Sequence, residues 1–131
     1  MTEGGSPERL PVFVYGTLKP DGRLFHHIAH AVREVVPASI CGELYDTPFG
    51  YPLLLSAGDE TCPLVSGVLI IALGELYDEM MRTIDVIEGE AGFEKGEREV
   101  LTENGRRVRA LVFFYREPPR YAHPYDGTSW A

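Results

Sequence analysis

Residues Leu64–Leu73 read LVSGVLIIAL, which is the most apolar stretch of the chain. A short run rich in β-branched side chains is typical of a strand that is buried on both faces and lies at the centre of a sheet. Gly67 interrupts the run and is a candidate for a β-bulge. The run is also far shorter than the roughly 20 apolar residues that cross a bilayer, so no membrane helix is predicted here.

The sequence after this strand predicts a helix and then a hairpin. Residues 75–87 carry apolar side chains at helical spacing, and Gly89 follows them where a C-cap glycine is expected. Strands are predicted at residues 97–102 and 107–115, on either side of Asn104 and Gly105. An Asn-Gly pair between two strands predicts a type I′ turn.

The sequence before the central strand begins with residues 1–9, which are polar and glycine-rich and are expected to form a flexible tail. A first strand is predicted at residues 10–15, and a helix is predicted at residues 24–34, closed by Pro37. Short strands with a tight bend at residues 47–50 follow.

These elements predict one α+β domain over residues 10–131, with five or six short strands, two helices and a strongly bent or closed sheet. The 14 glycines and 10 prolines agree with many short strands and turns rather than long helices.

Charge and cysteine content limit the class of protein. The chain has 131 residues, with 12 Lys or Arg against 20 Asp or Glu, and its formal net charge is −8. This charge opposes the phosphate neutralisation on which nucleic-acid binding depends, so DNA and RNA are not expected partners. Cys41 and Cys62 lack the spacing of a zinc site or redox motif, and we expect two buried free thiols in a cytoplasmic protein. The sequence leaves the oligomeric state open.

Tyr15, Gly16, Thr17 and Leu18 form the first candidate site, at the end of the first predicted strand. A glycine there lets successive backbone N–H groups turn inward, and such a cradle binds a carboxylate or an oxyanion. These residues leave open the alternative of an ordinary strand-ending glycine. The segment is not a phosphate-binding P-loop, because Arg23 stands where that motif requires lysine.

Glu88 is the second candidate, at the end of the predicted helix. The negative end of the helix dipole and the nearby Asp85 both disfavour its charge, so we expect a raised pKa, as a general acid or base near neutral pH requires. The alternative is a solvated carboxylate in the acidic run that continues to Glu103.

His26, His27 and His30 are the remaining cluster of chemical interest. His26 and His30 lie four residues apart on a predicted helix, but no evident third ligand accompanies them. We therefore predict no metal site, and a metal-dependent hydrolase is the weakest of the hypotheses.

Five motifs occur in a fixed order within residues 12–115. They read VYGTLKPDG, GELYDTPFGYPLL, IDVIEG, FEKGEREV and ALVFFY. Together they resemble the γ-glutamylcyclotransferase-like family, which includes the γ-glutamylamine cyclotransferases and the plant AIG2-like (avirulence-induced-gene) proteins. The resemblance implies a small mixed β-barrel flanked by two helices.

The resemblance also implies a reaction. Members of the family are transferases that cleave a γ-glutamyl amide without water: the α-amino group of the substrate attacks its own γ-carbonyl, releasing an amine or amino acid and 5-oxoproline. No cofactor or metal is needed. The substrate-binding loop of the family corresponds to Tyr15, Gly16, Thr17 and Leu18 in this sequence. The glutamate that acts as its general acid/base corresponds to Glu88. The alternative is a noncatalytic module that binds a small carboxylated metabolite in the same cavity.

Overall fold

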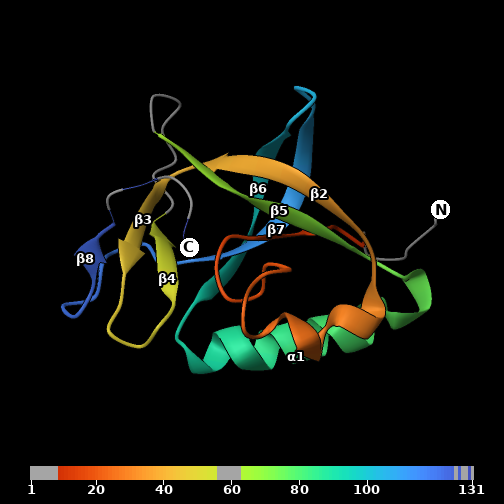
Figure 1. The fold of residues 1–131 in the computed structure, drawn as a ribbon, viewed down its shortest axis with the longest axis horizontal. Coiled ribbons are helices and arrows are strands. Elements are labelled where there is room, and N and C mark those ends of the chain that lie inside the picture. The colour runs from red at the N-terminus through yellow and green to blue at the C-terminus, as the bar shows by residue number, and fades with distance from the viewer. Residues whose placement is uncertain (1–8, 56–62, 126, 128–129, 131) are drawn as a thin grey trace.

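The fold is a closed mixed β-barrel with one α-helix and a small second sheet (Figure 1). This computed structural model describes residues 9–55, 63–125, 127 and 130. The barrel order is β1-β5-β2-β6-β7, and β1 pairs antiparallel with β5 but parallel with β7. The barrel strands are β1 (Val12–Val14), β2 (Val32–Cys41), β5 (Leu64–Ala72), β6 (Glu94–Thr102) and β7 (Arg107–Phe114). The predicted α+β class with a small mixed barrel is confirmed.

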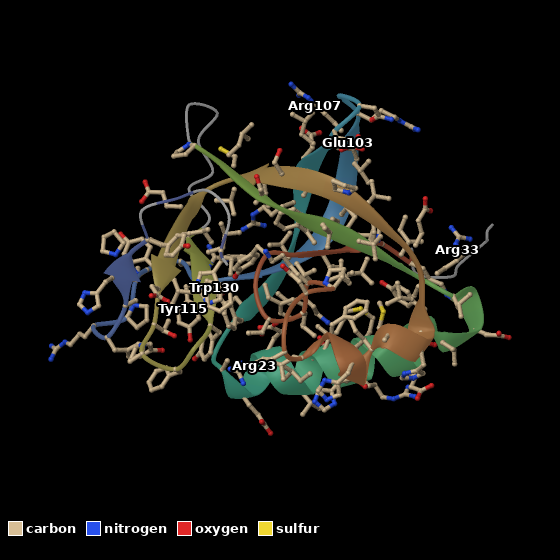
Figure 2. All side chains as sticks on the ribbon, viewed as in Figure 1. Arg23, Arg33, Glu103, Arg107, Tyr115 and Trp130 are labelled. Carbon is tan, nitrogen blue, oxygen red and sulfur yellow. The ribbon has the colours of Figure 1, made fainter. Side chains whose placement is uncertain are left out.

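The second sheet extends from one end of the barrel, on the left of Figure 1. Its order is β4-β3-β8, with β3 at Glu43–Asp46, β4 at Pro52–Leu55 and β8 at His123–Pro124. The bend predicted at residues 47–50 connects β3 to β4, and Gly50 adopts a φ of 82° there. Figure 2 shows Tyr115 and Trp130 on this side of the molecule, far from Arg33 at the opposite end.

The most apolar stretch forms β5, which pairs with β1 on one edge and with β2 on the other. Its predicted central position is therefore confirmed. The predicted bulge at Gly67 is wrong, because Gly67 pairs in regular register with Ala38. A Cβ atom at Gly67 would lie 2.3 Å from the carbonyl oxygen of Val14, so the glycine lets β1 approach closely.

Strand β1 separates two apolar clusters because its side chains alternate. Phe13 faces the cluster that fills the barrel, whereas Val12 and Val14 pack in a second cluster with Met80 and Ile84 of α1 (Tyr77–Glu90). The helix thereby covers the barrel from below in Figure 1. The loop that follows β1 is consequently held between the barrel and the helix.

The helix predicted at residues 24–34 is wrong. Two 3-10 turns, η1 (Phe25–His27) and η2 (Ala29–Ala31), replace its first part, and β2 begins at Val32. The β-branched residues at its end pair with β5 instead of continuing a helix. Pro37, which should have ended the helix, stands within β2. The pairing of β2 with β6 begins one residue later, at Ala38, so the N–H that proline lacks removes no hydrogen bond to β6.

The second predicted helix is present but longer. A 3-10 turn, η3 (Gly74–Leu76), leads into α1, which runs to Glu90. Gly89 is therefore inside the helix rather than at its cap. The left-handed residue that ends this region is Gly92, with a φ of 86°.

The hairpin between β6 and β7 is confirmed, but its turn is not type I′. The N–H of Gly105 donates to the carbonyl of Thr102, and the N–H of Thr102 donates to the carbonyl of Arg106. Asn104 and Gly105 therefore do not occupy the two central positions of the turn. This is the three-residue loop in which Gly105, at a φ of 85°, forms a bulge after the turn.

The predicted flexible tail lies outside the described residues except for Arg9, which donates to the carbonyl of Gly74 and lies over the Tyr77 ring. Cys41 is disulfide-bonded, so the expected free thiol is wrong at this position. Cys62 lies outside the described residues. None of the described helices is long and apolar enough to span a membrane.

Candidate active site

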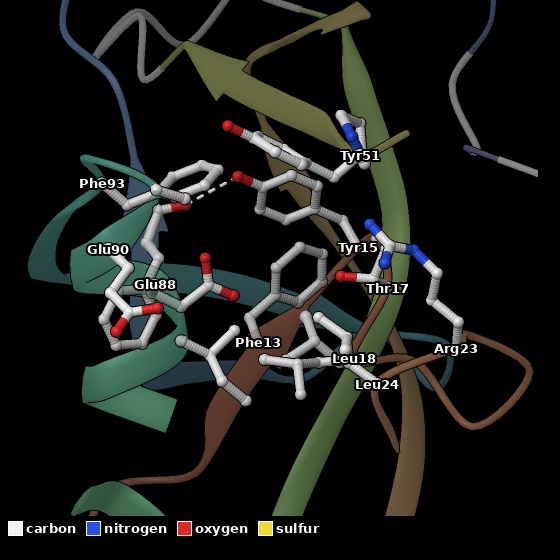
Figure 3. A pocket seen from close by; sticks show the side chains of 16 residues that line it. Phe13, Tyr15, Thr17, Leu18, Arg23, Leu24, Tyr51, Glu88, Glu90 and Phe93 are labelled. Atoms are coloured by element: carbon white, nitrogen blue, oxygen red, sulfur yellow. Dashed lines mark hydrogen bonds between the residues drawn. The ribbon is translucent and has the colours of Figure 1, made fainter. Parts of the chain in front are cut away.

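A pocket of about 320 Å³ opens where β1, the start of β4 and the end of α1 meet. This volume suits a small molecule. Figure 3 shows its walls, with Glu88 and Arg23 entering from opposite sides. The lining residues are Phe13–Leu18, Arg23, Leu24, Tyr51, Pro52, Ile87, Glu88, Glu90, Ala91, Phe93 and Phe113.

Glu88 lies in the last turn of α1 and directs its carboxyl group into this pocket. Apolar groups such as Phe13 and Phe113 form the wall around it. Burial raises the pKa of Glu88 from 4.5 to about 7, because the charged form loses contact with water. The pKa of Glu88 is therefore raised, as expected, but the cause is burial rather than the helix dipole or Asp85. Asp85 instead pairs with the Lys95 ammonium at 3.0 Å on a half-exposed surface.

Tyr15 joins three parts of the fold behind the pocket. Its buried hydroxyl donates to the carbonyl of Phe113 at 2.7 Å and accepts from the N–H of Leu54 at 3.0 Å. Burial, and after it the charge of Glu88, raises the pKa of Tyr15 well above its usual value. The phenol is therefore a neutral structural link between β1, β4 and β7 that faces Glu88.

The loop after Tyr15 presents unused hydrogen-bond donors. The carbonyls of Gly16 and Thr17 accept from Lys19 and Leu24, which fixes the course of the loop. By contrast, the N–H groups of Gly16, Thr17 and Leu18 have no hydrogen-bond acceptor within the described part of the chain. Buried backbone donors normally have partners, so three unpaired ones beside a pocket can receive a bound anion.

The side chain of Thr17 adds a fourth donor. It is buried, and its hydroxyl has no protein partner among the residues that the structure describes. Figure 3 shows this hydroxyl pointing into the pocket, toward the side from which Glu88 enters. The pocket thus brings together a carboxyl group that holds a proton near neutral pH and a row of donors suited to an oxyanion or carboxylate.

All five residues named from the sequence line this one pocket: Tyr15, Gly16, Thr17, Leu18 and Glu88. Arg23, Tyr51 and Phe93 also line the pocket, and of these sequence reasoning missed Arg23. Arg23 and Tyr51 lie within or beside the quoted motifs, but only the fold shows that they face the same space. Phe93 packs edge-on against Tyr115, with ring centroids 5.0 Å apart.

The three histidines lie away from this pocket. The rings of His26 and His27 are 4.0 Å apart, and His30 approaches the Glu79 carboxylate at 3.4 Å on an exposed surface. Over residues 9–55, 63–125, 127 and 130, no three His, Cys, Asp or Glu side chains gather as a metal site would need.

The family model described as gamma-glutamyl cyclotransferase, AIG2-like, matches residues 12–131. A comparison with curated proteins gives no match.

Several solved structures share the fold. An AIG2-like protein from Mus musculus is 20% identical, with a TM-score of 0.69 over 93% of this chain and 88% of that chain. A protein from Arabidopsis thaliana is 22% identical, with a TM-score of 0.65 over 90% and 78% of the two chains. A structure titled gamma-glutamyl cyclotransferase is 15% identical, with a TM-score of 0.54 over 88% and 70%. At these identities the likeness establishes the fold.

Proposed function

The chain belongs to the gamma-glutamyl cyclotransferase, AIG2-like family, and from this premise we propose that it converts a γ-glutamyl amide into 5-oxoproline and a free amine or amino acid. The observation that carries the proposal is the pairing, in one pocket, of a carboxyl group whose pKa is raised to about 7 with three unpaired backbone donors. The substrate is a small molecule that enters this pocket.

Glu88 moves the proton. The α-amino group of a free substrate is mostly protonated near neutral pH and cannot attack until it loses a proton. A carboxylate with a pKa near 7 takes that proton readily and, once protonated, is acidic enough to return it to the departing nitrogen. One side chain therefore serves both halves of the reaction.

The loop at Gly16–Leu18 stabilises negative charge. When the amine attacks the γ-carbonyl, its oxygen becomes an oxyanion, and preorganised N–H donors stabilise that state more than the starting amide. The same donors, with the Thr17 hydroxyl, are also suited to the substrate's α-carboxylate. Holding nitrogen and carbonyl together in a pocket of this size lowers the entropic cost of ring closure.

The reaction is internally balanced. A bond forms between the α-nitrogen and the γ-carbon, the bond from the γ-carbon to the leaving nitrogen breaks, and the proton passes through Glu88 from one nitrogen to the other. No water is consumed and no electrons change hands, so the proposed step requires no cofactor.

The test is the release of 5-oxoproline from a panel of γ-glutamyl amines and γ-glutamyl amino acids. Wild-type protein and a Glu75→Gln variant, changed at an exposed carboxylate before α1, are expected to form product at equal rates. Glu88→Gln is expected to lose at least about a hundredfold in rate, as is usual for a lost general acid/base. Binding of these compounds without product in any variant would replace the proposal with the noncatalytic module.

A further inference from the structure

Arg23 is a cation at the rim of the pocket without an ionic partner. It is the one Lys or Arg side chain that lines the pocket in the described part of the chain. No carboxylate among the described residues forms an ion pair with it, and its side chain is exposed. Its guanidinium lies near the β3–β4 bend, where a Cβ atom at Gly50 would be 3.7 Å away.

The position of Arg23 relative to Glu88 sets what it can contact. In the proposed reaction the glutamyl part must present its amine to Glu88, which is half-buried, and its carbonyl to the loop donors. Because Glu88 also returns the proton to the leaving nitrogen, that nitrogen must lie within its reach, and it is the substituent on the nitrogen that extends away from Glu88. Because Arg23 is exposed and enters from the opposite side of the pocket in Figure 3, it lies where that substituent meets solvent.

Glu90 is the other charged group among the pocket residues, and the helix turns it away. Two residues along an α-helix correspond to a rotation of about 200°, so the side chain of Glu90 leaves α1 on the side opposite to that of Glu88. Figure 3 shows the Glu88 carboxylate in the centre of the pocket and that of Glu90 at its edge. On its own side of the pocket, opposite both carboxylates in Figure 3, Arg23 is therefore the one charged side chain among the described lining residues.

We propose that Arg23 binds a carboxylate on the leaving group, and that γ-glutamyl amino acids are accordingly preferred over γ-glutamyl amines. The inference rests on the proposed function and narrows it to a substrate class. A guanidinium at a pocket rim is suited to a carboxylate, through charge-assisted hydrogen bonds. The contact is the same in the bound and reacting states, so it acts on KM rather than on kcat.

The experiment compares three γ-glutamyl amides that differ in the charge that the leaving group carries within the amide: the amide of glycine (anionic), of isobutylamine (neutral and of similar shape) and of putrescine (cationic). The proteins are the wild type, Arg23→Gln, Arg23→Glu and the matched control Arg33→Gln, an exposed arginine at the other end of the molecule. Wild type and control are expected to show a KM about two- to fivefold lower for the glycine compound than for the isobutylamine compound, typical of a solvent-exposed charge pair. The preference should weaken from about 0.02 M to about 0.5 M salt.

Arg23→Gln should abolish this preference while leaving kcat and the KM of the isobutylamine compound unchanged, and Arg23→Glu should shift it toward the putrescine compound. An equal rise in KM for all three compounds would show that Arg23 contacts the glutamyl part that they share, and it would overturn the inference. An unchanged KM for all three would overturn it as well. Affinities measured calorimetrically in a Glu88→Gln background separate the two proposals. If the wild type releases no 5-oxoproline, the proposed reaction is wrong. The inference about Arg23 is then still decided by whether the Arg23 substitutions change the order in which the protein binds the three compounds.

Discussion

Replacing Glu88 by glutamine is expected to stabilise the protein at neutral and alkaline pH but not in acid. Glutamine keeps the shape of the side chain and removes its charge. Since burial raises the pKa of Glu88 from 4.5 to about 7 in the folded protein, the carboxyl group favours folding fully below pH 4.5, and this contribution is lost as the pH rises through 7. At about 1.4 kcal/mol for each pH unit, ionisation of the buried group costs about 2 to 3 kcal/mol once its partial exposure is allowed for.

The measurement is urea unfolding of both proteins at several values between about pH 4 and about pH 9. Trp130 is the single tryptophan and packs against the barrel core, so its fluorescence reports unfolding. The difference in free energy of unfolding should be close to zero in acid, should grow above pH 4.5 and should level off above pH 7. Asp85→Asn, on the exposed side of the same helix, is the control and should show no such growth. A constant difference, or a wild type that gains stability over the variant at high pH, would refute the assignment of a buried carboxyl group.

Three further outcomes are expected. Tyr15→Phe leaves the buried N–H of Leu54 unpaired and should lower the free energy of unfolding by about 1 to 3 kcal/mol in urea titrations; an unchanged midpoint would contradict the structural role of this hydroxyl. Gly67→Ala brings a methyl group to 2.3 Å from the carbonyl oxygen of Val14 and should destabilise by at least about 2 kcal/mol, whereas a protein as stable as the wild type would show that β1 does not lie so close. Because Glu88 must be ionised to accept a proton, kcat/KM for 5-oxoproline release should rise with pH to a plateau above an apparent pKa near 7; a profile that is flat through pH 7 would assign the proton transfer to another group.

The sequence predicts well where its signal is strong and local. The run at Leu64–Leu73 is apolar throughout, and it forms the strand between β1 and β2. The pattern at residues 75–87 buries one face and forms α1. The segment at residues 24–34 shows the opposite case, because its helical spacing competes with β-branched residues that pair with a distant strand. That pairing is a tertiary effect and is not visible in the local pattern.

The candidate site was also predictable only as far as its signals are local. The chemistry of a helix end and a strand end made Glu88 and the loop after Tyr15 candidates but left a solvated carboxylate and an ordinary strand-ending glycine open, and their roles came from the family resemblance. Their meeting around one pocket depends on how α1 packs under the barrel, and the cause of the raised pKa of Glu88 depends on that packing as well. Arg23 carries no local signal of its own, since an exposed arginine in a loop is ordinary.

The parallel pairing of β1 with β7 has a consequence for how the protein is made. β1 is the first strand of the described residues and is synthesised before β7, yet the carbonyl that receives the Tyr15 hydroxyl belongs to Phe113, 98 residues later. The loop after Tyr15 therefore lacks this support until β7 has been synthesised. A nascent chain or fragment that ends before β7 can hold every residue named for proton transfer and anion binding and still lack a formed pocket.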